Sequence, residues 1–145
     1  MSTIGSILVD SAAWYALADK SDALHREATA FLKTHLRENA WLTTHPIVME
    51  TWALINRRLG RTAAMTFWER LRSGGVALMP LDAADWEAAW RIALAFPDQD
   101  FSLVDCTTFA IMERLGIMQV FTFDDHFLVY RYGARRQQAF IRLPW

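Results

Sequence analysis

The sequence predicts an α/β fold in three layers, with helices covering both faces of a mainly parallel central sheet. Two observations support this prediction. Short apolar runs typical of strands alternate along the chain with segments whose apolar residues recur at helical spacing. Helices connect successive strands, and parallel strands need crossovers of this kind. The 145 residues fit a single domain, residues 1–145, and a hydrophobic fraction of 53% argues against disorder.

The first half of the chain is expected to form two units, each of one strand and two helices. In chain order, the expected elements are a strand at 4–9, helices at 11–18 and 22–37, a strand at 41–44, and helices at 46–59 and 61–72. The helix at 22–37 carries an apolar stripe through Ala28, Phe31 and Leu32. Pro46 suits a first helical turn because its φ is fixed, and Gly60 suits a helix end.

The second half continues the alternation and ends on an edge strand. The expected elements are a strand at 76–79, a helix between Asp82 and Pro97, a helix at 103–115, a strand at 119–123 and a strand at 139–143. Asp82 and Ser102 are residue types that cap helices, and Gly116 ends the second of these two helices. The core positions predicted for the helices at 61–72 and after Asp82 are Ala64, Trp68, Leu71, Trp86, Trp90 and Ala93.

Composition narrows the possible functions. The single cysteine, Cys106, excludes an internal disulfide, and its apolar helix favours a packing role. The four histidines match no spaced zinc ligand set. Uncharged stretches fall short of the ~20 residues of a membrane span, and no basic segment precedes the first apolar run, so we expect a cytoplasmic protein. The net charge of -1 gives no overall basic footprint for nucleic acid.

Four acidic residues lie beside apolar runs that are expected to be buried: Asp10, Glu50, Asp105 and Asp124. The strands in ILVD and VFTFD end in a carboxylate, and strand carboxyl ends line the ligand crevice of an open α/β sheet. Two charges about 5 Å apart repel by roughly 3 kcal/mol at an effective dielectric constant of ~20. A cluster of such groups therefore indicates a site for a hard cation, Mg²⁺ or Mn²⁺.

The first two acids also have structural explanations. Asp10 could cap the helix that follows it, although Ser11 could do so equally well. Glu50 interrupts an apolar stripe that contains Ile47 and Leu54, and a lone buried glutamate is rare. The pattern therefore favours a functional role for both residues without excluding the structural one.

The later acids have similar alternatives. Ser102 and Asp105 match a capping box, a role that can coexist with metal binding. Asp124 and Asp125 could both be turn residues; Asp124 lies closer to the strand and is preferred, with Asp125 as the alternative fourth acid. Asp100 is either a loop residue or an acid behind the metal ligands.

Arginines near Glu50 are candidates for phosphate binding. Seven residues after Glu50, Arg57 returns to nearly the same helix face, roughly 10 Å away. That separation suits a phosphate one or two nucleotides from a metal ion. Arg57 and its neighbour Arg58 could equally belong to an ordinary solvated face.

The ordered segments ILVDSAAWYAL, VMETWALINRRLG, DQDFSLVDCTTFAIMERLGI and VFTFDDHF together resemble the PIN-domain ribonucleases, especially the VapC-like toxins of prokaryotic toxin–antitoxin pairs. The resemblance runs over nearly the whole chain. It implies that Asp10 and Asp105 are the main Mg²⁺ ligands, with Glu50 and Asp124 completing the acidic catalytic site. It also implies a three-layer PIN-like fold, a homodimer, and inhibition by a small antitoxin protein from an adjacent gene.

The resulting hypothesis is metal-assisted hydrolysis of RNA phosphodiester bonds with one or two Mg²⁺ ions, or Mn²⁺. Glu50 could orient the attacking water, and Ser102 or Thr122 could contact the water shell of the metal. Arg57 and Arg58 would hold the RNA backbone without reading its sequence. The alternative is a catalytically idle PIN-like module that binds RNA or protein.

Tryptophan content suggests where a partner would bind. Seven tryptophans in 145 residues exceed what a small core readily hides. Trp14 and Trp52 lie on helices that flank the proposed site, where the antitoxin of the family is expected to lay an amphipathic segment into an apolar groove. Core packing is the alternative for each of them.

Overall fold

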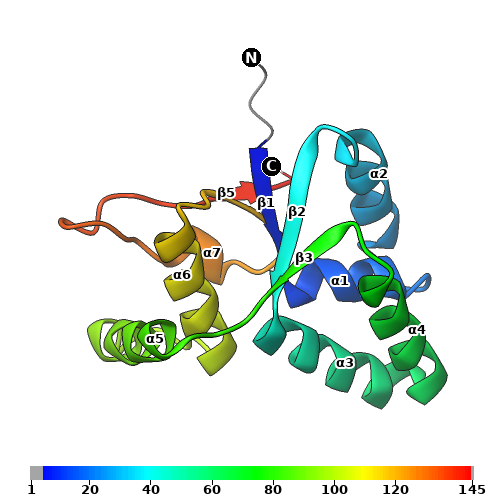
Figure 1. Cartoon of the computed structure of the whole chain (residues 1–145), viewed down its shortest axis with the longest axis horizontal. Helices are drawn as coiled ribbons and strands as arrows, with labels where there is room; N and C mark the ends of the chain where they lie inside the picture. The colour runs from blue at the N-terminus through cyan, green and yellow to red at the C-terminus, as the bar shows by residue number, and fades with distance from the viewer. Residues whose placement is uncertain (1–4, 145) are drawn as a thin grey trace.

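The computed structural model describes residues 5–144 and has the expected alternation of strands and helices (Figure 1). Its elements are β1 (Gly5–Val9), α1 (Ser11–Ala18), α2 (His25–His35), β2 (Asn39–Thr44), α3 (His45–Leu59), α4 (Arg61–Arg72), β3 (Val76–Met79), α5 (Ala83–Ala95), α6 (Leu103–Leu115), β4 (Gln119–Phe121), α7 (His126–Val129) and β5 (Ile141–Leu143). Residue 4 of the first predicted strand lies outside the described residues. Within residues 5–144, every helix is too short or too polar to cross a membrane.

Within residues 5–144, five strands form one sheet in the order β3-β2-β1-β4-β5, and all neighbouring strands are parallel. The prediction of a mainly parallel sheet is therefore confirmed. Strand β1 is central, with β4 beside it, and Val9 pairs with Phe121 at the ends of these two strands. This register places residue 10 next to residue 122. The carboxyl ends of β1 and β4 thus open onto the same edge of the sheet.

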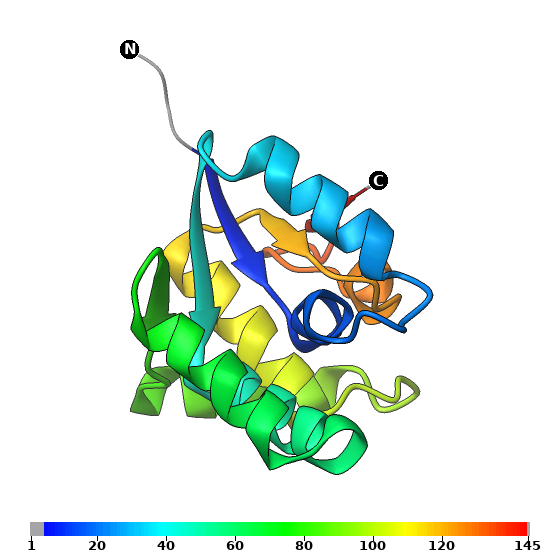
Figure 2. The same ribbon diagram turned by 90° about the vertical axis from the view of Figure 1, so that its right-hand side faces the viewer.

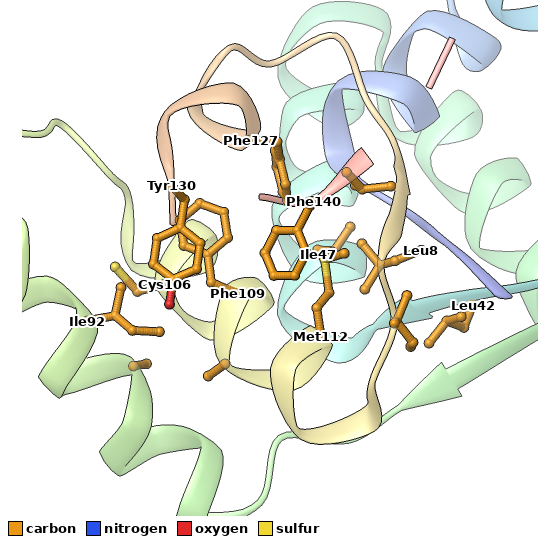
Figure 3. Close-up of a cluster of buried hydrophobic side chains, with 14 residues drawn as sticks. Leu8, Leu42, Ile47, Ile92, Cys106, Phe109, Met112, Phe127, Tyr130 and Phe140 are labelled. Carbon is orange, nitrogen blue, oxygen red and sulfur yellow. The ribbon is translucent and has the colours of Figure 1, made fainter. Parts of the chain in front are cut away.

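Helices cover both faces of the sheet, as the three-layer prediction required (Figures 1 and 2). Side chains alternate along β1. Ile7 and Val9 pack with residues of α1 and α2, whereas Leu8 packs with residues of α5, α6 and α7. Figure 3 shows this second cluster, in which the rings of Phe109 and Tyr130 lie against each other. A third apolar cluster joins α1, α3 and α4.

Several helix ends form where local sequence predicted them. The Thr44 side chain accepts the Ile47 N–H at the start of α3, and Gly60 ends that helix with a φ of 97° that favours glycine. Asp82 and Ser102 each form a capping box with the acid three residues later. These short-range bonds fix where α5 and α6 begin.

The predicted buried face of α5 is wrong. Trp86 and Trp90 are 51% and 62% exposed, and Ala93 is also exposed. The buried residues of this helix are Asp85, Ala89 and Ile92. Arg114 of α6 donates to both carboxylate oxygens of Asp85, at 2.6 and 2.9 Å. This ion pair satisfies a buried charge and turns the Asp85 side of α5 towards α6, so the tryptophans face outwards.

Other differences from the prediction are smaller. Ala64 and Leu71 of α4 are buried as expected, but Trp68 is 45% exposed, and Phe67 occupies the core instead. The structure shortens three predicted elements to His25–His35, Gln119–Phe121 and Ile141–Leu143. It also adds the short helix α7, which the sequence pattern did not predict.

Candidate metal centre

Asp10 follows β1 directly and is 3% exposed. Its backbone N–H donates to the Phe121 carbonyl at 3.1 Å, which continues the pairing of β1 with β4. The Thr122 hydroxyl donates to Asp10 Oδ2 at 2.9 Å. The side chain of Asp10 makes no capping bond to α1, so helix capping does not account for this buried carboxylate.

Asp105 lies in the first turn of α6 and forms the capping box that its sequence predicted. Its Oδ2 accepts the Ser102 N–H at 3.0 Å, and Ser102 Oγ accepts the Asp105 N–H at 3.0 Å, which completes the capping box. The same Oδ2 lies 2.7 Å from Nδ1 of His126. The carboxylate of Asp105 therefore caps α6 and also contacts the segment after β4.

Asp124, rather than Asp125, faces the other acids. Asp124 Oδ1 accepts the backbone N–H of His126 at 2.9 Å, and the Asp124 N–H donates to Thr122 Oγ1 at 3.1 Å. The Asp125 side chain is 85% exposed and forms an ion pair with Arg142 at 2.8 Å. Asp100 lies on an exposed loop, from which its charge favours the protonated form of His126.

The ligand atoms of Asp105, Asp124 and His126 all lie within 4.8 Å of one another. Burial, with smaller contributions from the charges of Asp105 and Asp124, raises the pKa of Asp10 from 3.8 to about 7. Burial likewise raises the pKa of Asp105, and the Asp124 carboxylate adds to the effect. Three buried or half-buried carboxylates at one edge of the sheet repel one another, and an oxygen-rich site of this charge fits a hard divalent cation.

Glu50 lies apart from this group. It is half-buried on α3 between the buried Ile47 and the half-buried Leu54, as its position in the apolar stripe predicted. The Ser11 hydroxyl donates to Glu50 Oε1 at 2.7 Å. Since Ser11 follows Asp10, this bond holds Glu50 beside the start of α1. Among residues 5–144, the compact set of possible ligands includes neither Glu50 nor Asp10.

The two arginines predicted to bind phosphate are both exposed near the end of α3. The guanidinium of Arg58 lies over the ring of Tyr15, 5.1 Å from its centroid, and this contact restrains the side chain. Arg57 forms no ion pair with any residue in the described part of the chain. Its charge is therefore available to an anionic ligand.

His126 is the residue of this site that sequence reasoning missed. The four histidines were compared only with zinc ligand spacing, which they do not match. The relevant signal was the position of His126 directly after two acids at the end of a strand, in VFTFDDHF. The charges of Asp124 and Asp105 outweigh the partial burial of the imidazole, so the pKa of His126 is raised.

A family model of the PIN domain matches residues 7–131 of the chain. The chain belongs to the PIN domain family. Among the relatives of this PIN domain is the 23S rRNA-specific endonuclease VapC20 of Mycobacterium tuberculosis, which is 33% identical over 128 residues, covering 83% of this chain and 91% of VapC20. These matches confirm the resemblance to PIN-domain proteins that the sequence motifs indicated.

Solved structures agree with this assignment. The crystal structure of M. tuberculosis VapC20, described as a sarcin-ricin loop cleaving toxin, matches this PIN domain with a TM-score of 0.80 and 31% identity, covering 85% of this chain and 93% of the other. VapBC2 of Rickettsia felis, bound to a promoter DNA fragment, matches with a TM-score of 0.69 over 94% and 96% of the two chains. At 8% identity, the second match shows a common fold only.

Proposed function

We propose that this PIN domain is a metal-dependent endoribonuclease that acts as the toxin of a toxin–antitoxin pair. The observation that carries the proposal is the group of three acids formed by Asp10 after β1, Asp124 after β4 and Asp105 in the first turn of α6, in which the charges of Asp105 and Asp124 act on Asp10. The likeness to VapC20 in both sequence and structure supports RNA as the substrate, and 23S rRNA is the first RNA to test.

In this proposal Asp10 and Asp105 are the main ligands of Mg²⁺ or Mn²⁺, and Glu50 and Asp124 complete the catalytic site. The bound cation would supply charge stabilisation and a more acidic water molecule. The chain itself orients the ligands through hydrogen bonds, as Thr122 does for Asp10. Glu50, which accepts the Ser11 hydroxyl bond, would orient the attacking water molecule.

The exposed arginines at the end of α3 are proposed to bind the RNA backbone. Arg57 has no competing ion pair among the described residues, and Arg58 is held over Tyr15 with its charge near the surface. Contacts of this kind supply affinity that depends on salt and is independent of base sequence.

An apolar hollow of about 610 Å³ on α3, α4 and β3 supports an antitoxin partner. It is lined by His45, Val48, Met49, Trp52, Trp68 and Leu78. The indole N–H of Trp52 is buried and has no acceptor among the described residues. An amphipathic antitoxin segment could cover the hollow and offer a carbonyl to this donor. Trp14, in contrast, packs edge-on against Phe67 and donates to Thr43 Oγ1, so the core explanation holds for it.

The expected homodimer also has a candidate surface. Trp86, Trp90 and Leu94 recur at intervals of four residues on α5 and are each at least half exposed. An apolar row of this kind is typical of a contact surface. We propose that a second copy covers it. Light scattering after gel filtration tests this: Trp90→Glu should yield a monomer, and a variant that stays dimeric would exclude α5 from the interface.

The decisive experiment is cleavage of 23S rRNA by the purified protein with Mg²⁺, with Mn²⁺ and with EDTA. Cleavage that requires the divalent ion and disappears in Asp105→Asn is the expected result. A folded protein that binds Mg²⁺ but cleaves neither 23S rRNA nor total cellular RNA would favour the idle binding module instead. Co-expression with the adjacent reading frame, followed by a pull-down, tests the antitoxin partner. A protein that is harmless to cells when it is expressed alone would contradict the toxin assignment.

A further inference from the structure

His126 joins two acids that come from different elements of the fold. Its Nδ1 lies 2.7 Å from Asp105 Oδ2 on α6 and 3.4 Å from Asp124 Oδ1 after β4. Its backbone N–H also donates to Asp124 Oδ1 at 2.9 Å. A single residue therefore engages both carboxylates through separate groups.

Packing between α7 and α6 fixes the position of this histidine. Phe127, the next residue, is fully buried against Phe109 with their ring centroids 5.1 Å apart, and Tyr130 stacks on Phe109 at 4.1 Å (Figure 3). Phe109 lies four residues after Asp105, one turn along the same side of α6. The aromatic contacts thus hold α7 against the part of α6 that carries Asp105.

The hydrogen bonds show what His126 does to Asp105. Oδ2 of Asp105 faces two groups, the Ser102 N–H at 3.0 Å and His126 Nδ1 at 2.7 Å. Two donors on one oxygen fix the plane of the carboxylate and leave its second oxygen for another ligand. When Asp105 is ionised, the carboxylate can only accept, so Nδ1 must donate the proton of this bond, and a nitrogen that donates does not bind a cation.

We infer that His126 is a positioning residue of the metal site. Its Nδ1–H holds Asp105 in the orientation that binds the cation, and its backbone N–H does the same for Asp124. The Phe101 ring meets the imidazole edge-on, with centroids 5.3 Å apart, and keeps the ring in place. This inference rests on the metal-dependent function proposed above. Loss of such a supporting bond typically weakens metal affinity 10–100-fold.

Two variants separate the hydrogen bond from the shape of the side chain. His126→Leu removes the donor, whereas His126→Asn keeps an N–H group at nearly the position of Nδ1. Mn²⁺ binding is measured by calorimetry for both and for the wild-type protein, and melting in EDTA reports whether each variant folds. We expect about 10-fold or greater loss of affinity in the leucine variant and less than about 3-fold in the asparagine variant. Raising the Mn²⁺ concentration should then restore RNA cleavage by the leucine variant.

A measurement on the unaltered protein tests the same inference without a variant. The ¹⁵N chemical shifts of the His126 imidazole in the Mg²⁺-loaded protein report which nitrogen carries the proton. A protonated Nδ1 supports the positioning role, and an unprotonated Nδ1 overturns it, whether or not the leucine variant folds. Equal Mn²⁺ affinity in folded leucine and wild-type proteins also overturns it. Failure of the wild-type protein to bind any divalent ion would instead contradict the proposed function.

Discussion

Replacement of Asp10 by asparagine should stabilise the metal-free protein while removing a metal ligand. The Asp10 side chain is 3% exposed, and its burial raises the pKa from 3.8 to about 7. One pKa unit corresponds to about 1.4 kcal/mol, so the ionised carboxylate destabilises the folded chain by an amount on the order of 4 kcal/mol. Asparagine has nearly the same shape, and its carbonyl can still accept the Thr122 hydroxyl bond. The two side chains differ in charge and in one carboxylate oxygen that becomes an NH₂ donor, and the charge is the larger difference at this buried position.

The dependence on pH follows from the direction of the pKa shift. The folded-state pKa lies above the unfolded value, so the folded chain holds an additional proton between pH 3.8 and about 7. The stability associated with that proton is lost as the pH rises through this window. In EDTA, wild-type protein should therefore melt at a lower temperature at pH 8 than at pH 5. For a chain of this length, the advantage of Asp10→Asn at pH 8 should be on the order of 10 °C, and smaller at pH 5.

Scanning calorimetry with EDTA and with Mg²⁺ measures both effects. Mg²⁺ should raise the melting temperature of the wild-type protein and leave the variant nearly unchanged, because the cation stabilises only a folded chain that binds it. Asp125→Asn is the matched control, since that carboxylate is 85% exposed and should alter melting little. A variant that melts below wild type at pH 8 in EDTA would refute the argument that charge burial dominates at Asp10.

Three further predictions concern the other charged residues. Asp105→Asn should abolish metal-dependent RNA cleavage without lowering the melting temperature in EDTA, because the amide oxygen can still accept the Ser102 N–H; nuclease assays and melting are measured together. Arg57→Ala should weaken RNA binding at low salt and reduce the salt slope by about one, with Mg²⁺ affinity unchanged, as fluorescence anisotropy would show. Arg114→Met should lower the free energy of unfolding, measured in urea, by about 2 kcal/mol, because the buried Asp85 loses its partner. The loss is smaller than for a fully buried pair, since the Arg114 side chain is 38% exposed.

Each of these predictions has an outcome that contradicts it. An Asp105→Asn protein that does not fold would assign the residue mainly to the capping box. An unchanged salt slope would return Arg57 to the ordinary solvated surface. Arg91→Met, at an exposed position of α5, is the control for Arg114, and an equal loss of stability in both variants would show that the ion pair contributes nothing.

Several features of this protein were determined by sequence alone because their causes are local. The capping boxes at Asp82 and Ser102 and the helix end at Gly60 depend on residues within a few positions of one another. Short apolar runs and the helical spacing of apolar residues set the alternation of strands and helices, which implied the parallel sheet. The positions of the four acids beside apolar runs were enough to propose a metal site at the edge of that sheet.

Other features were decided only by tertiary structure. A local pattern would place the charged Asp85 outside and the apolar Trp86 inside, but an ion pair with Arg114, 29 residues away, reverses this choice. The bond between Thr122 and Asp10 joins residues 112 positions apart, and the contact between His126 and Asp105 spans 21. Helical periodicity describes one element at a time and carries no information about which partner neutralises a buried charge. That partner is chosen when the elements pack, because a buried charge without one is too unfavourable to persist in the folded chain.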